Sequence, residues 1–320
     1  MSTGFARVAV LGLGLIGGSI LQTVRHAGIA GVGYDVDVAA LEAASSDGFA
    51  VAPSTAAAAR GADLIVLAMP LPAVRDAAAA LRGHLSPGAI VTDVGTLKQP
   101  VVDAVRAELP GVSFVGGHPL AGVEDTGWPA ARPAMFRDAS WSLVLEADTD
   151  LDDWLRLASF VCDIGARPVP TTAADQDAAV ARVIGLPHVL AEALALTGLA
   201  GGPLGLTLAA GSYMSGSRVA RTRPELVTTW CDGNPALPTA LDDAISYLVE
   251  ARDALRSGGS VLSLADAGHA ARINWEHRQV EPVELRADAA ALVAHGRCGG
   301  WITAVLQEPD GVRLLGMRPV

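Results

Sequence analysis

This 320-residue sequence has few cysteines, few charged residues and a single lysine, Lys98. Its three cysteines, Cys162, Cys231 and Cys298, lie far apart and form no CxxC pair, which argues against a disulfide framework and a cysteine metal site. Charged residues make up only 18% of the chain and the net charge is −11, so a basic surface for nucleic acid is not expected. The sequence thus predicts a cytoplasmic protein with no metal and no nucleic-acid partner.

Long apolar runs are also missing, although hydrophobic residues form 51% of the chain and the mean hydropathy is +0.37. The most apolar stretches, Val8–Leu15 and Leu64–Met69, are too short to cross a bilayer. No basic segment with a long apolar region opens the sequence, so a secretory signal is not expected. We therefore predict a globular protein of about two domains, with no membrane partner.

Short apolar or β-rich runs alternate with potential helices in the first half of the chain. This spacing is typical of βαβ units and predicts an α/β fold, with a Rossmann-type, doubly wound parallel sheet in residues 1–170. The five runs are Val8–Leu11, Gly31–Tyr34, Leu64–Ala68, Ile90–Asp93 and Phe114–Val115, and Ser140–Leu145 and Ala166–Val169 are predicted as later strands.

The pattern changes near Pro170, after which apolar residues fall at helical spacing. Residues 171–279 are predicted to form an all-helical substrate and dimerisation domain, with a kink at Pro187 inside its first helix. Residues 280–320 are predicted to be a small C-terminal tail of uncertain structure. Within that tail, Ala289–His295 is a candidate helix, and Trp301–Leu306 and Val312–Leu315 are candidate strands.

A glycine loop, Gly12-Leu13-Gly14-Leu15-Ile16-Gly17, follows the first predicted strand and opens a helix. Glycines in this pattern permit a tight turn and a close approach of the backbone to a pyrophosphate, which the helix N-terminus then faces. Asp35 ends the second predicted strand, where a carboxylate accepts hydrogen bonds from a ribose diol and repels a 2′-phosphate. The expected cofactor is therefore NAD, and Leu15 and Ile16 are counted with the loop. Met69 and Pro70 end the third run at the same edge, although Pro70 also fits a plain turn.

Two more segments end predicted strands at that edge, Thr92–Lys98 and Val115–Gly122, the second reading Val-Gly-Gly-His-Pro-Leu-Ala-Gly. Leu186-Pro187-His188 follows in the helical half. In these motifs and in their order, the sequence resembles the prephenate dehydrogenase family from the glycine loop to about Arg256. The resemblance implies NAD-dependent oxidation of a cyclohexadienyl carboxylate with loss of carbon dioxide, as in tyrosine biosynthesis.

The resemblance also implies roles for individual residues. His118 matches the histidine that accepts the substrate's hydroxyl proton, a task suited to an imidazole that titrates near neutrality. Thr96 matches a serine that hydrogen-bonds the same hydroxyl, although it also fits a helix N-cap. These two are the predicted catalytic residues.

Three further residues are predicted to bind substrate. Arg218 matches an arginine that binds a substrate carboxylate, and His188 a histidine at the active-site end of a long helix. Lys98 is placed to favour an anionic substrate or to lie at the rim of the site. Each has a plainer alternative: a solvated surface arginine for Arg218, and for His188 a core histidine bonded to a backbone carbonyl.

The helical half departs from the family pattern. Gln176-Asp177 stands where members often have His-Asp, Ile184-Gly185 where they often have Ser-His, and Tyr213–Gly216 where they have a Phe-Arg-Asp stretch. Prephenate is the leading substrate, and arogenate or 4-amino-4-deoxyprephenate is the alternative. A second alternative is a catalytically silent NAD-binding protein. The helical half carries more apolar surface than a thin domain can bury alone. We therefore predict a homodimer that pairs through this half.

Overall fold

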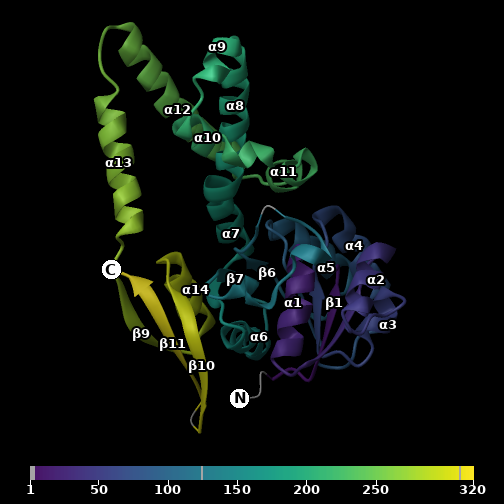
Figure 1. Cartoon of the computed structure of the whole chain (residues 1–320). Coiled ribbons are helices and arrows are strands. Elements are labelled where there is room, and N and C mark those ends of the chain that lie inside the picture. Colours follow the sequence, from purple (N-terminus) through teal and green to yellow (C-terminus); the bar gives the residue numbers. More distant parts are fainter. Residues whose placement is uncertain (1–3, 124, 310) are drawn as a thin grey trace. The chain divides into compact units, whose positions relative to one another are not determined.

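The structure is a computed structural model that describes residues 4–123, 125–309 and 311–320. The chain folds into two compact units, which are described separately below (Figure 1). The first unit extends to Gln176 and also contains Glu281–Pro319, and the second consists mainly of Asp177–Val280. The last forty residues of the chain therefore belong almost entirely to the first unit.

A five-stranded parallel sheet with the strand order β2-β1-β3-β4-β5 forms the centre of the first unit. This α/β sheet confirms the predicted Rossmann-type fold class. Its strands are β1 (Arg7–Leu11), β2 (Ala30–Tyr34), β3 (Leu64–Leu67), β4 (Ile90–Asp93) and β5 (Ser113–Val115).

Alternate residues of the central strands face opposite sides of this sheet, as the pleat requires. On β1, Val8 and Val10 pack in one apolar cluster, whereas Ala9 and Leu11 pack in the other. Helices cover both sides, which explains why these strands are apolar throughout. The helices that follow the strands are α1 (Leu15–His26), α2 (Val38–Ser46), α3 (Thr55–Ala59), α4 (Leu71–Ala80) and α5 (Gln99–Glu108).

A second sheet continues the first unit, with strand order β6-β7-β8. The predicted strands correspond to β7 (Ser140–Val144) and β8 (Arg167–Thr171), which are parallel and joined by α6 (Leu151–Asp163). Strand β6 (Gly117–Pro119) was not expected, because three residues are too few to show a period. It runs antiparallel to β7 and carries His118 opposite Ser142. Two 3₁₀ turns, η1 (Trp128–Ala130) and η2 (Pro133–Phe136), lie between β6 and β7.

The C-terminal segment forms a third sheet with strand order β10-β11-β9. Strand β9 (Val280–Arg286) precedes α14 (Ala289–Arg297), and β10 (Trp301–Glu308) pairs antiparallel with β11 (Gly311–Pro319). Leu292, Ile302 and Leu314 from this segment are buried in the same cluster as the first sheet. The segment between the two candidate strands includes Asp310, which lies outside the described residues.

The second unit is helical throughout its described elements. After α7 (Ala173–Val180), which crosses the boundary of the units, the chain forms a π-helical turn, η3 (Ala181–Gly185), and α8 (Leu186–Ala200). Short elements follow, and then two long helices. They are α9 (Gly202–Thr207), α10 (Gly211–Gly216), η4 (Arg218–Arg221), α11 (Pro224–Cys231), α12 (Leu237–Arg256) and α13 (Leu262–Glu276).

Pro187 lies one residue inside α8, directly after the π-helical turn. Proline has no N–H to donate and its ring crowds the preceding turn, so regular α-helical hydrogen bonding is interrupted there. The irregularity predicted at this proline is thus a widened turn at 181–185, and such turns are frequent at functional sites.

The expectation that no apolar stretch is long enough to cross a bilayer is wrong for helical residues 173–200. This run of 28 residues contains a window of mean hydropathy 1.6, long and apolar enough to cross a membrane by length and composition alone. Only 17% of that window is buried. The run was not expected, because Pro187 and scattered polar residues divide it into shorter apolar stretches in the sequence.

Candidate active site

The glycine loop joins β1 to α1 with the geometry that a dinucleotide-binding turn needs. Gly12 has a φ of +102°, and a Cβ there would lie 2.3 Å from the carbonyl oxygen of Ala68. A Cβ on Gly17 would lie 1.9 Å from the Gly12 carbonyl oxygen, so only glycine allows the turn to close on the helix. Gly14 instead borders open space, with nothing within 4 Å of a Cβ.

The N-terminus of α1 is free to receive an anion. Gly14 occupies its N-cap position without a side-chain hydrogen bond, and the first turn contains no acidic residue. The first N–H groups of a helix have no partner within it, so those of Leu15 and Ile16 point to a ligand or to solvent. Together with the space beside Gly14, this terminus fits a pyrophosphate.

Asp35 ties the end of β2 to the glycine loop. One carboxylate oxygen accepts the backbone N–H of Leu13 at 2.5 Å, and the other accepts that of Asp37 at 2.9 Å. Each oxygen keeps a second lone pair for a ribose hydroxyl. The half-buried side chain therefore lies beside the glycine loop at the end of β2 and keeps acceptor capacity, and its contact with a ribose stays a prediction.

Met69 and Pro70 follow β3 at the same carboxyl edge. Met69 is half-buried, whereas Pro70 is exposed and stands at the N-cap position of α4. Its φ of −59° suits this place, which agrees with the alternative of a turn residue.

Lys98 is fully buried, with an exposed fraction of 0%. Its ammonium group forms an ion pair with Asp93 and donates to the Gly117 carbonyl at 2.6 Å. Asp93 also accepts the N–H of Gly117 at 3.0 Å, so the pair holds both polar groups of this residue. A buried ammonium with these contacts is neither open to a substrate nor at the rim of the site, which corrects both the predicted attraction of an anionic substrate and the alternative of a rim position. Lys98 instead fixes the strand that begins at Gly117 to the end of β4.

His118 follows directly in β6 and is buried, with 7% of its surface exposed. Its Nδ1 atom lies 2.8 Å from the side-chain amide nitrogen of Gln176, a residue of α7 that is equally buried. The same amide nitrogen lies 3.4 Å from the carbonyl oxygen of Thr96. Gln176 was noted in the sequence only as a departure from a family pattern, and its contact with His118 was not anticipated.

The imidazole of His118 is held neutral. Burial, and secondarily the positive charge of Lys98, lowers the pKa of His118 to about 3. A neutral ring at physiological pH can accept a proton without first losing one. The shift also moves the titration of this histidine far below the neutral range assumed from the sequence.

Thr96 is half-buried in the loop between β4 and α5. Helix α5 begins at Gln99, its N-cap position is Lys98, and no side chain caps it. The alternative role of Thr96 as a helix N-cap is therefore wrong. Its backbone carbonyl lies near Gln176, which places Thr96 beside the His118–Gln176 pair within the first unit.

His188 and Arg218 belong to the second unit. His188 is buried in α8, and its Nδ1 lies 2.8 Å from the Ile184 carbonyl oxygen. Its ring packs edge-on against Trp230, with 4.8 Å between the two ring centroids. A carbonyl only accepts, so Nδ1 carries a proton in this contact and Nε2 is the nitrogen that it leaves free. The carbonyl-bonded histidine considered from the sequence is thus present, and Nε2 stays available to a ligand.

Arg218 begins the 3₁₀ turn η4 and is exposed. Among the described residues, the ion pairs do not include its guanidinium. A guanidinium without a carboxylate partner keeps its paired donors for a ligand carboxylate.

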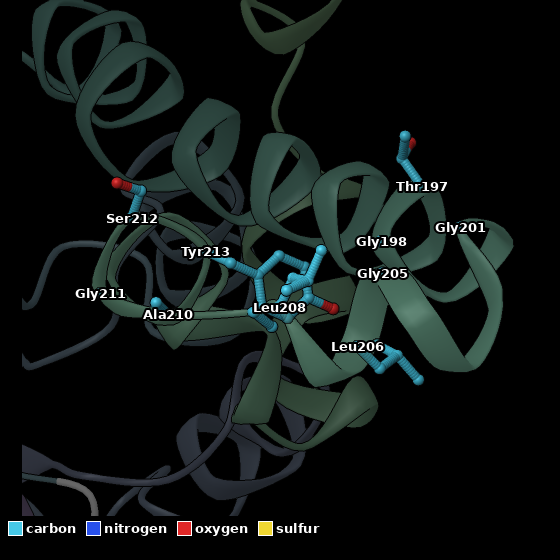
Figure 2. Close-up of a pocket in the computed structure, with 11 residues that line it drawn as sticks. Thr197, Gly198, Gly201, Gly205, Leu206, Leu208, Ala210, Gly211, Ser212 and Tyr213 are labelled. Carbon is cyan, nitrogen blue, oxygen red and sulfur yellow. The ribbon is translucent and has the colours of Figure 1, made fainter.

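A hollow of about 590 Å³ lies in the second unit between α8, α9 and α10, and contains none of the predicted site residues (Figure 2). Glycines and small apolar residues line most of it, among them Gly198, Gly205 and Ala209. Tyr213 is its titratable residue, and the hydroxyl already donates to the Ala195 carbonyl at 3.3 Å. The hollow therefore offers no acid or base. In the described part of the chain, no cluster of histidine, cysteine and acidic residues has the arrangement of a metal site.

Comparison with known proteins gives one family. Residues 21–169 match the family described as prephenate dehydrogenase, nucleotide-binding domain. A cyclohexadienyl dehydrogenase of Zymomonas mobilis is 32% identical over 277 residues, which cover 80% of this chain and 90% of that protein.

Two solved structures show the same fold over most of the chain. A provisionally assigned prephenate dehydrogenase of Corynebacterium glutamicum is 38% identical with a TM-score of 0.80, covering 85% of this chain and 89% of that one. The arogenate dehydrogenase of Synechocystis is 27% identical with a TM-score of 0.75, covering 84% of this chain and 99% of that one.

Proposed function

Because this chain is an oxidoreductase of the prephenate dehydrogenase family and carries that family's NAD-binding domain, we propose that it converts prephenate into 4-hydroxyphenylpyruvate. The observation that carries the proposal is the buried, neutral His118 in a strand fixed by Lys98. A neutral imidazole has a nitrogen that can accept the hydroxyl proton that the oxidation releases. The product is a precursor of tyrosine.

The cofactor site fits NAD. The Gly12–Gly17 turn and the open N-terminus of α1 suit its pyrophosphate, and Asp35 suits its adenosine ribose. When bound, NAD accepts the hydride from the substrate carbon that bears the hydroxyl. The negative charge of Asp35 would repel the 2′-phosphate of NADP, so we propose NAD as the preferred cofactor.

Side chains of the protein accept the proton and bind the substrate in this proposal. We propose that His118 accepts the hydroxyl proton through Nε2, because Nδ1 already contacts Gln176. Thr96 hydrogen-bonds the hydroxyl, and Arg218 binds a substrate carboxylate. His188 offers Nε2 as a further contact to the substrate. The ring carboxylate leaves as carbon dioxide, and its electron pair completes the aromatic ring.

Arogenate is the second candidate substrate. The 27% identity to an arogenate dehydrogenase supports it, as does the altered helical half, where glutamine, isoleucine and glycine replace polar family residues. Arogenate and prephenate share the ring and its carboxylate but differ in the side chain, which carries an amino group in arogenate and a keto group in prephenate.

An assay of NADH production with prephenate, arogenate and 4-amino-4-deoxyprephenate tests the proposal. We expect the highest kcat/KM with prephenate. A higher value with arogenate would transfer the function to the second candidate. Binding of NAD without turnover of any of the three would instead favour the silent NAD-binding protein.

We further propose that two chains pair through the second unit. The large apolar residues of this unit that lie exposed include Val183, Leu190, Leu194, Leu196, Leu199, Leu204, Leu208, Ile245, Leu248, Leu255, Leu262 and Trp275. Large apolar side chains exposed in this number are typical of an interaction site. Light scattering at micromolar concentration should give twice the mass of 32.6 kDa, and a monomeric mass would contradict the proposal.

A partner chain explains the apolar helical run 173–200 better than a membrane does. The run contains Asp175, Asp177, Arg182 and Glu192, and a charged side chain costs about 2.5–3.5 kcal/mol at the centre of a membrane helix. Arg182 is moreover paired with Asp243 of α12 at 2.8 Å. We propose a cytoplasmic enzyme, consistent with three free cysteines. Cell fractionation should find it outside the membrane pellet.

A further inference from the structure

Gln176 lies in the first turns of α7, and hydrogen bonds of neighbouring residues fix the start of this helix in the first unit. Helix α7 starts where Ala173 donates its N–H to the Glu146 carboxylate at 2.8 Å. The neighbouring Asp175 accepts from the Thr172 hydroxyl and, at 2.8 Å, from Arg297 of the C-terminal helix α14. The first turn of α7 is therefore anchored to the loop after β7 and to α14. This anchoring presents the amide of Gln176 to Nδ1 of His118 at 2.8 Å, with both side chains buried.

A neutral imidazole carries its proton on one of two nitrogens, and the partner of each nitrogen decides which. If the amide nitrogen of Gln176 donates to Nδ1, the proton of His118 resides on Nε2, and neither nitrogen can accept another. If the amide carbonyl faces Nδ1, the proton resides on Nδ1 and Nε2 is an open base. Rotation of the amide by 180° exchanges these two states. The terminal nitrogen and oxygen change places while the rest of the side chain stays where it is, because the two atoms are nearly equal in size.

Proton transfer itself selects between the two orientations. Once His118 has accepted a proton, both ring nitrogens carry hydrogen, so the partner of Nδ1 must be an acceptor. An amide nitrogen in that place would oppose the protonated ring, whereas an amide carbonyl stabilises it. The nitrogen-facing orientation gains only a contact of 3.4 Å with the Thr96 carbonyl, which is long for a hydrogen bond.

We propose that Gln176 is the positioning residue that fixes the tautomer of His118, its side-chain carbonyl accepting the Nδ1–H and leaving Nε2 free for the substrate proton. This inference rests on the proposed function of His118 as the base. Gln176 supplies an uncharged acceptor, which orients the ring without stabilising its protonated form as strongly as a carboxylate would. The positive charge of the buried Lys98 also acts on the ring and opposes its protonation.

Nitrogen NMR of the imidazole groups in the cofactor-free enzyme at neutral pH tests the tautomer directly. His118→Asn identifies the His118 signals by their loss. We expect a protonated Nδ1 and an unprotonated Nε2 in the wild type, and a shift toward protonated Nε2 in Gln176→Leu. A protonated Nε2 in the wild type would overturn the proposal even if the enzyme oxidises prephenate. Absence of turnover, by contrast, would overturn the proposed function and leave the tautomer measurement valid.

Kinetics provide the second measurement. Gln176→Leu should lower kcat about 10- to 100-fold with little change in KM, because it removes an acceptor from a ring that becomes charged. Gln176→Glu keeps an acceptor but raises the pKa of His118, so kcat should decline on the acid side at a higher pH than in the wild type. Gln99→Leu, an exposed glutamine on α5, is the matched control and should behave as wild type. An unchanged kcat in Gln176→Leu together with an unshifted profile in Gln176→Glu would contradict the proposal.

Discussion

The two units differ most in how they bury apolar side chains. In the first unit, two large clusters fill both sides of the central sheet, and the C-terminal segment adds Leu292, Ile302 and Leu314 to one of them. In the second unit, the buried apolar cluster consists of Ala181, Leu237 and Ala240 with partly buried neighbours. The first unit thus contains its own core, whereas the second leaves most of its apolar surface exposed.

In the proposed enzyme, this contrast corresponds to a division between catalysis in the first unit and substrate binding and assembly in the second. The first unit holds the glycine turn and His118, the proposed proton acceptor, on strands of its sheets, where position decides the rate of chemistry. The second unit has Arg218 on an exposed turn and the exposed apolar residues that we propose contact a partner chain. Variants in the first unit should therefore affect kcat and folding, and variants in the second should affect KM and assembly.

The largest expected effect is on catalysis and belongs to the first unit. His118→Asn removes the base and should lower kcat about 10²- to 10⁴-fold, or roughly 3–5 kcal/mol in activation free energy. NAD affinity, measured by calorimetry, should stay at the wild-type value. Wild-type turnover in this variant would remove His118 from the mechanism.

Lys98→Met should cause the largest loss of stability. Removing one partner of a buried ion pair leaves the Asp93 carboxylate without its cation, which costs about 3–5 kcal/mol. Chemical denaturation would measure the change. Arg106→Met is the control, because its pair with Asp148 is exposed and should cost about 1 kcal/mol or less. Equal losses in the two variants would show that the Lys98 pair is not structural.

In the second unit, Arg218→Ala should act on binding. A hydrogen bond to a charged group contributes about 1.5–3 kcal/mol, so KM for prephenate should rise roughly 10- to 100-fold with a smaller change in kcat. Steady-state kinetics measure both constants. An effect confined to kcat would place Arg218 in the chemical step and weaken the division between the units.

Assembly offers a second way to break the comparison. The double variant Leu196→Glu, Leu199→Glu places charge on side chains that are 68% and 61% exposed, and should yield a monomer in light scattering. Val38→Glu, at a similarly exposed apolar position in the first unit, should leave the mass unchanged. A dimer that survives the double variant would place the interface elsewhere.

Cofactor preference should respond more gently. Asp35→Asn keeps an acceptor for the Leu13 N–H but removes the charge that repels a 2′-phosphate. The ratio of kcat/KM for NAD to that for NADP should fall, mainly because NADP improves. A wild type that uses NADP equally well would contradict the role of Asp35.

The smallest expected effect is that of pH on the wild type. His118 has to be neutral to accept a proton, and its pKa is lowered to about 3, so it stays competent throughout the neutral range. The kcat profile should therefore show no imidazole titration between about pH 5 and pH 8. A decline in kcat toward acid with a midpoint near 6.5 would show that His118 titrates as an ordinary histidine.

Much of this enzyme follows from the sequence alone. Alternating apolar runs predicted the parallel sheet, because a strand buried on both faces must be apolar along its length. The glycine turn and Asp35 predicted an NAD-binding domain, since their chemistry depends on neighbours close in sequence. The motif around His118 predicted the family to which the chain belongs, whereas the role of His118 as proton acceptor stays a prediction.

Contacts between distant residues were decided only by the tertiary structure. The burial of Lys98 depends on Gly117, 19 residues away, and the partner of His118 is Gln176, 58 residues away. The C-terminal strands joined the first unit because their apolar residues complete its core, which no local pattern reveals. Periodicity and motifs report which face of an element is apolar, whereas the partner of a buried polar group is set by packing across the whole fold.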